Sequence, residues 1–111
     1  MTDELSRLYE LADLVLAIEQ AMRGADYWHD DVPSPAAMAS RTPFCADTLA
    51  FSEWLQFIFI PRMRALIEDN APMPQASAIA PLAEEALVEQ PGKQAVVDRL
   101  RAFDRAISNQ G

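Results

Sequence analysis

Residues 3–23 read DELSRLYELADLVLAIEQAMR, and this stretch decides the fold class. Its apolar residues recur at steps of three and four, at Leu5, Leu8, Ala12, Val15, Ile18 and Met22. That spacing places them on one face of an α-helix, whereas a half-buried strand would alternate apolar and polar residues. Gly24 follows, a residue type that suits the end of a helix. The stretch therefore predicts an amphipathic helix that packs against other helices.

Three further helices are expected on the same grounds, at residues 47–69 and 77–89 and from Pro91, as the first helical position, to about residue 107. In the last of these, the apolar residues recur at steps of four, three and four: Val96, Leu100, Phe103 and Ile107. Ser77 is a residue type that caps helix N-termini, so we place the start of the third helix there. We predict an all-α fold, a four-helix bundle formed as a single domain by residues 1–111.

Prolines mark two interruptions of this helical pattern. Segment 25–46 holds Pro33, Pro35 and Pro43, and each restricts the residue before it to non-helical geometry. We therefore expect a long ordered loop between the first and second helices. Pro61 lies inside the second helix, where its ring lacks an N–H and clashes with the carbonyl four residues earlier. A proline kink in the second helix is the expected result.

The chain is acidic: among 111 residues, 17 acids face 9 bases and the net charge is −8. Residues 1–31 carry most of this excess. An acidic surface repels phosphate backbones, so we expect no direct nucleic-acid binding, while a basic protein partner would be attracted. The first residues lack the basic and continuous apolar regions of a signal peptide, no apolar run reaches about 20 residues, and Cys45 is the only cysteine. We therefore expect a cytoplasmic protein without membrane association.

Residue types that carry catalysis or bind metals are scarce. His29 and Cys45 are the only residues of their kinds, and one of each is too few for a zinc site. The three glycines form no phosphate-binding loop. His29 precedes Asp30 and Asp31, but adjacent side chains diverge on a loop, so we interpret this run as a solvated loop end. We expect no catalytic residues, no metal and no cofactor, and a protein that is not an enzyme.

Arg62 stands out in the second helix, because it follows Pro61 at the end of an almost wholly apolar run. An arginine buried there needs a carboxylate or carbonyl partner. One hypothesis is a structural ion pair between Arg62 and Asp47 or Glu53. The alternative hypothesis is an exposed arginine in a binding groove.

A docking surface is expected where the loop around Trp28 meets the kinked second helix. Tryptophan, methionine and arginine are enriched in the cores of interfaces. The second helix also has more apolar residues than one core-facing stripe requires, so part of that surface is available to a partner. The candidate interaction residues are Trp28, Asp47, Trp54, Arg62 and Met63.

Several motifs in the chain resemble those of one family. Residues 43–48 read PFCADT, residues 53–57 read EWLQF, residues 60–63 read IPRM and residues 72–74 read PMP. Together they resemble the YqcC-like family of small bacterial proteins, and the resemblance covers nearly the whole chain. It implies a helical bundle and, through gene neighbourhood, an association with a tRNA pseudouridine synthase. It implies no catalytic residues.

Two functions fit these expectations. The first is a non-catalytic helical interaction or accessory protein, linked to a tRNA-modifying enzyme such as a pseudouridine synthase, which would be its protein partner. The second is a small-ligand-binding helical bundle, with its pocket between the second helix and the loop around Trp28. Capture of a protein partner distinguishes the first function from the second.

Overall fold

The structure, a computed structural model, describes residues 2–108, and in that range every regular element is helical. The α-helices are α1 (Thr2–Gly24), α2 (Pro35–Met38), α3 (Phe51–Trp54), α4 (Ile60–Glu68), α5 (Ile79–Ala86) and α6 (Lys93–Ser108). A 3₁₀ turn, η1 (Pro43–Cys45), and a π-helical turn, η2 (Leu55–Phe59), complete the elements. The predicted all-α class is confirmed. None of the described helices has the length and hydropathy that crossing a bilayer requires.

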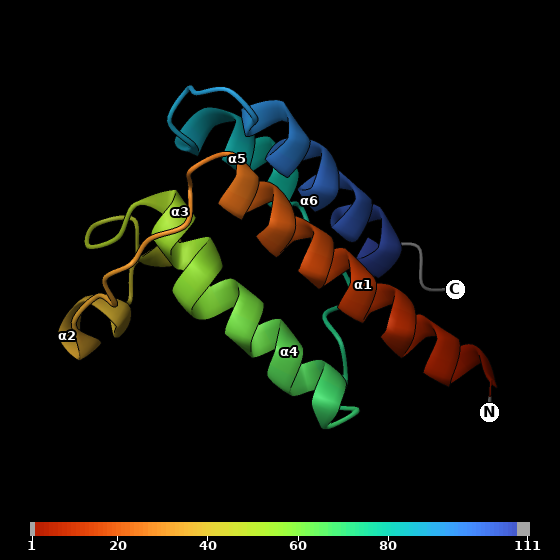
Figure 1. Cartoon of the computed structure of the whole chain (residues 1–111). Helices are drawn as coiled ribbons and strands as arrows, with labels where there is room; N and C mark the ends of the chain where they lie inside the picture. The colour runs from red at the N-terminus through yellow and green to blue at the C-terminus, as the bar shows by residue number, and fades with distance from the viewer. Residues whose placement is uncertain (1, 109–111) are drawn as a thin grey trace.

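Helix α1 packs against both α4 and α6, and α5 packs against α6 (Figure 1). The core lies between these helices. On α6 the four predicted apolar positions are all at most 1% exposed: Val96, Leu100, Phe103 and Ile107. On α1 the buried stripe is Leu11, Val15, Ile18 and Met22. Leu5 was predicted to share this face but is exposed, because at about 100° per residue it lies roughly 120° around the helix from Leu11.

The second predicted helix is continuous from α3 through η2 to α4, and it begins at residue 51 rather than 47. Its middle turn is π-helical, because the Ile60 N–H bonds to the carbonyl of Leu55, five residues earlier. This wider turn ends at Phe59, two residues before Pro61, where a kink was expected. A π turn contains one extra residue, so it changes which side chains share a face of the helix.

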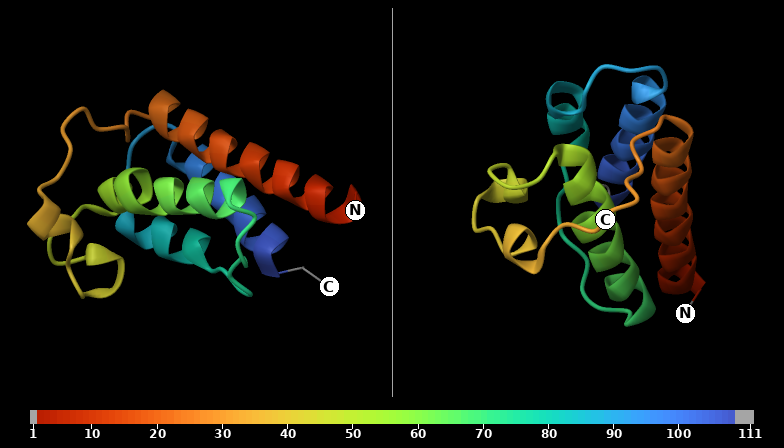
Figure 2. Two further views of the ribbon diagram at one scale, coloured as in Figure 1. Left: turned by 90° about the horizontal axis from the view of Figure 1, so that it is seen from below. Right: turned by 60° about the vertical axis from the view of Figure 1, so that its left-hand side comes forward.

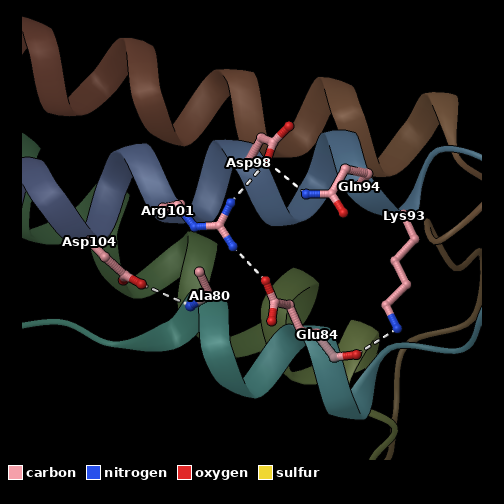
Figure 3. A network of polar contacts seen from close by, with 7 residues as sticks. All are labelled: Ala80, Glu84, Lys93, Gln94, Asp98, Arg101 and Asp104. Carbon is pink, nitrogen blue, oxygen red and sulfur yellow. Dashed lines mark hydrogen bonds and ion pairs between the residues drawn. The ribbon is translucent and has the colours of Figure 1, made fainter.

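Helix α5 begins at Ile79, two residues later than predicted, and Ser77 is not its N-cap. The carboxylate of Asp104 on α6 takes that role (Figure 3). It accepts the N–H groups of Ile79 at 3.0 Å and Ala80 at 2.8 Å, and the hydroxyl of Ser77 at 2.5 Å. Ser77 therefore donates to the group that caps the helix instead of capping it. Farther along α5, Glu84 pairs with Arg101 of α6.

Segment 25–46 leaves the other helices at one end of the molecule, where it carries α2 and η1 outward (Figure 2). Its first residues are fastened to the connection between α5 and α6. The buried hydroxyl of Tyr27 donates to the carbonyl of Val88 at 2.6 Å, and burial raises the pKa of Tyr27. The side-chain amide of Gln90 donates to the carbonyl of Ala25. These bonds join the start of the loop to the main body of the molecule.

Candidate functional site

A row of aromatic rings crosses the junction of segment 25–46, the second helix and α6. Phe44 lies edge-on to Trp54, with ring centroids 4.8 Å apart. Trp54 stacks on Phe59 at 5.6 Å, and Phe59 lies edge-on to Phe103 at 5.2 Å. The row ties the loop to the helical core, and its outermost member, Phe44, reaches the surface beside a groove.

The groove consists of two adjoining depressions that share Phe44, Trp54 and Arg62 as lining residues. The larger depression, of about 570 Å³, lies between the second helix and the wall formed by residues 38–45. The smaller depression, of about 350 Å³, lies between α4 and residues 74–79. We call the two together the Arg62 groove.

Arg62 is exposed and forms no ion pair within residues 2–108. Both carboxylates proposed as its partners are engaged elsewhere. Asp47 accepts the hydroxyl of Ser40 at 2.5 Å, and Glu53 accepts the backbone N–H of Ala50 at 2.8 Å. The ion-pair hypothesis is therefore wrong, and the structure places Arg62 as an exposed arginine that lines a groove.

Trp54 and Met63 also line the groove, but they are more deeply buried than an exposed docking residue would be. Trp54 is 9% exposed and Met63 is 2% exposed. The reason is that both side chains also belong to the hydrophobic core. They form the floor of the groove, and their large buried area gives that floor a fixed shape.

Asp47 is exposed and does not line the groove, but it orients a residue that does. Its carboxylate accepts the Ser40 hydroxyl, and this hydrogen bond holds the pKa of Asp47 below its usual range. The Ser40 oxygen in turn accepts the N–H of Thr42 at 3.1 Å. Ser40 and Thr42 both line the larger depression, so Asp47 orients part of the wall without lining the groove itself.

Trp28 lies apart from the groove, although it was predicted to belong to the same surface. Its ring is half-buried, and the guanidinium carbon of Arg23 lies 4.3 Å from the ring centroid. The loop around Trp28 does meet the second helix, through the next residue, His29. The expected meeting of loop and helix is therefore present, but Trp28 itself packs over the end of α1.

His29 is not a solvated loop end, as the sequence suggested. Its Nε2 is hydrogen-bonded to the hydroxyl of Ser52 at 2.8 Å. Its backbone N–H and carbonyl both pair with the side-chain amide of Gln56, at 2.8 Å and 2.9 Å. Gln56 is buried within the π turn, so it satisfies its amide by docking the loop. Adjacent acids in the sequence gave no indication of this contact.

Phe44 is the lining residue that sequence reasoning missed, and it contributes to both depressions. Phe44 and Cys45 adopt positive φ angles of 59° and 51°, a conformation that is uncommon for residues other than glycine. Hydrogen bonds in the turn support it, since the Cys45 N–H donates to Thr42 at 2.9 Å and the Cys45 carbonyl accepts from Leu49 at 2.8 Å. Strained backbone of this kind occurs preferentially at binding sites. No residue type in the sequence signals it.

The chemistry that the groove offers is binding through one cation, two hydroxyl-bearing residues and an aromatic floor. Cys45 is a buried member of the wall, with its sulfur 3.8 Å from the Met38 carbonyl. Within residues 2–108 no three histidine, cysteine or acidic side chains are grouped as a metal ion would require.

Comparison with known proteins places this chain among related sequences. The family model DUF446, described as "tRNA pseudouridine synthase C", matches residues 10–106. An uncharacterised protein of Haemophilus influenzae is 36% identical over 92 residues, covering 83% of this chain and 87% of that protein. The uncharacterised protein YqcC of Escherichia coli is 37% identical over 89 residues, covering 79% of this chain and 82% of that protein.

Two further comparisons concern a solved structure and a longer protein. The solution NMR structure of YqcC from E. coli matches with a TM-score of 0.82 and 31% identity, over 95% of this chain and 91% of that one. A protein of Pectobacterium carotovorum named tRNA pseudouridine synthase C is 35% identical over 72 residues, which are 65% of this chain but only 19% of that protein. Sequence and structure agree, and the chain belongs to the YqcC-like family, DUF446.

Proposed function

We propose that this chain is a non-catalytic accessory protein of a tRNA pseudouridine synthase, and that it acts by binding the enzyme. The observation that carries the proposal is the match to the Pectobacterium protein, in which a related segment makes up 19% of a chain named tRNA pseudouridine synthase C. Joining two modules in one polypeptide raises their effective concentration to about the millimolar range. That arrangement is useful when the two modules work in contact, and separate chains must achieve the same contact by binding.

The charge of the chain supports a partner of this class. A net charge of −8 complements the basic surface that a tRNA-binding enzyme needs, and complementary fields accelerate association. In this proposal the protein is a cytoplasmic four-helix bundle with a kinked second helix. It binds the enzyme and leaves tRNA contacts to that enzyme.

A small-ligand-binding role is the second candidate function. The volume of the larger depression, about 570 Å³, supports it, because ligand pockets range over roughly 300–1,000 Å³. The ligand would then occupy the Arg62 groove without any protein partner. The relationship to part of a named synthase favours the accessory role.

The test is isothermal titration calorimetry of this chain against the tRNA pseudouridine synthase C of the same bacterium, at physiological salt. We expect saturable binding with a Kd of about 10 μM or tighter. A second pseudouridine synthase from the same cell serves as the control and should give no heat of binding. The chain alone should neither shift tRNA in a gel nor form pseudouridine. Equal binding to both synthases, or to neither, would contradict the proposal.

A further inference from the structure

Arg62 is a cation whose charge is not neutralised by any ion pair within residues 2–108, and it lines the smaller, mostly apolar depression of the groove. Arg64, on the same helix, shows the contrast, because it pairs with Glu19 of α1. Arg41 also lacks an ion pair in this range, and it stands between two wall residues of the groove, Ser40 and Thr42. In a protein with a net charge of −8, this groove is thus lined by the cation Arg62 and by no carboxylate.

The smaller depression beside Arg62 is mostly apolar, and its floor is buried. Its floor includes Trp54, Phe59 and Met63, all of which are at most 9% exposed. Leu66 and Ile79 continue the apolar lining of the smaller depression. A floor of this kind receives an apolar side chain, whereas the planar guanidinium of Arg62 suits a carboxylate, which it can bind through two parallel hydrogen bonds.

We propose that the Arg62 groove binds a short segment of the synthase that carries an acidic residue beside a large apolar one. This inference rests on the accessory function proposed above. The apolar side chain lies on the aromatic floor, and the carboxylate meets Arg62. The tRNA-binding surface of such an enzyme is basic, so an acidic segment differs from its surroundings. Pairing of that segment with Arg62 would fix the relative orientation of the two proteins.

Charge distinguishes this occupant from the other candidates. A basic segment is disfavoured, because it would place its cations beside Arg62 with no carboxylate lining the groove. A second copy of this chain brings another net charge of −8, so the two copies repel one another overall. An acidic segment on a different and more basic protein is attracted to Arg62, and the protein that carries it is not repelled by the net charge of this chain.

The test compares three variants for binding to the synthase: Arg62→Glu, Arg62→Lys and, as a matched control, Arg105→Glu. Arg105 is likewise an exposed arginine without an ion pair in the described range, but it lies on α6 and does not line the groove. We expect Arg62→Glu to weaken binding at least about tenfold, Arg62→Lys to weaken it less, and Arg105→Glu to change it less than about twofold. Melting temperatures should stay unchanged, because Arg62 has no ion pair to lose.

An array of overlapping synthetic peptides that covers the synthase identifies the occupant. Peptides that bind the wild-type chain, but not Arg62→Glu, should contain aspartate or glutamate beside an apolar residue. Binding by basic peptides only, or synthase affinity that is unchanged in Arg62→Glu, would overturn the inference and leave the accessory function standing. Self-association that Arg62→Glu abolishes would assign the groove to a second copy. Absence of any synthase binding by the wild-type chain would refute both proposals.

Discussion

The indole of Trp54 stacks on the ring of Phe59, five residues later in the same helix, with 5.6 Å between ring centroids and 28° between ring planes. In a regular α-helix, residues five apart lie roughly 140° around the axis from each other and do not stack. The π turn from Leu55 to Phe59 adds the residue that brings the two rings to one face. The floor of the Arg62 groove is therefore a consequence of this turn.

The π turn predicts which phenylalanine of the second helix matters for stability. Phe59→Ala should lower the free energy of unfolding by about 3–5 kcal/mol, because Phe59 is 6% exposed and contacts both Trp54 and Phe103. Phe57→Ala is the control and should cost clearly less, since Phe57 is only partly buried. Regular helical spacing would instead pair Phe57 with Trp54. Urea denaturation measures both variants, and a larger loss for Phe57→Ala would contradict the π turn.

The parts of the fold that follow from helical periodicity could be predicted from the sequence. The core stripe of α6, and Val15, Ile18 and Met22 on α1, were identified because a spacing of three and four residues reports directly on one helix face. The ends of the helices were less accurate. Helix α5 begins later than expected, because its first N–H groups are capped by a residue that is distant in the sequence. It also ends earlier, at Ala86, and α6 begins at Lys93 rather than at Pro91.

The candidate site was predicted only in part. Arg62, Trp54 and Met63 do meet at one groove, because they lie on one continuous helix and its π turn changes which side chains share a face. Trp28 and Asp47 do not line it, since the path of a 22-residue segment depends on tertiary contacts such as the pairing of His29 with Gln56. The positive φ angle of Phe44 has no counterpart in local sequence preference, so its place in the groove could not be foreseen.

Asp104 is predicted to be the most costly aspartate to remove from α6. Asp104→Ala would leave the buried N–H of Ala80 and the partly buried N–H of Ile79 without an acceptor, at a cost of about 2–3 kcal/mol. Asp98→Ala is the matched control, because Asp98 is exposed and bonds only to Gln94 and Arg101; its cost should be about 0.5 kcal/mol or less. Thermal denaturation compares the two variants. Equal losses would show that the capping contact does not stabilise α5.

Position 92 is predicted to tolerate no residue other than glycine. Its φ angle is +91°, and an added Cβ would lie 2.7 Å from the Cβ of Ala25. Gly92→Ala should therefore destabilise the protein by about 1–3 kcal/mol. Gly24→Ala is the control, because its added Cβ meets nothing within 4 Å and the residue ends a helix. The control should be neutral or slightly stabilising. A melting curve for Gly92→Ala that matches the wild type would refute the close approach of Gly92 to Ala25.

The ion pairs of Glu19 predict that the folded protein loses stability at acidic pH. Burial raises the pKa of its carboxyl, but hydrogen bonds and charge from Arg23 and Arg64 outweigh this and hold the pKa below its ordinary value of 4.5. The folded state therefore favours the ionised form, and the resulting stability is present above pH 4.5 and is lost as the pH falls through the lowered pKa.

The measurement is the melting temperature of the wild type and of Glu19→Gln between about pH 7 and pH 3. The wild type should be the more stable protein near neutral pH, and the difference should shrink as the pH falls below 4.5. Asp47, whose pKa is also lowered, is unchanged in both proteins and so cancels in the comparison. A difference that stays constant or grows toward low pH would contradict the assignment.

The most direct test of the central claim, that the Arg62 groove is where the synthase binds, is methyl NMR of methionine-labelled chain titrated with unlabelled synthase. Met38 and Met63 line the two depressions, Met22 is buried on α1, and Met73 lines a separate hollow beside the first turns of α1. The Met38 and Met63 methyl signals should shift or broaden on binding, while those of Met22 and Met73 stay in place. Binding that shifts the Met73 signal and leaves the Met38 and Met63 signals unchanged would contradict binding at the Arg62 groove.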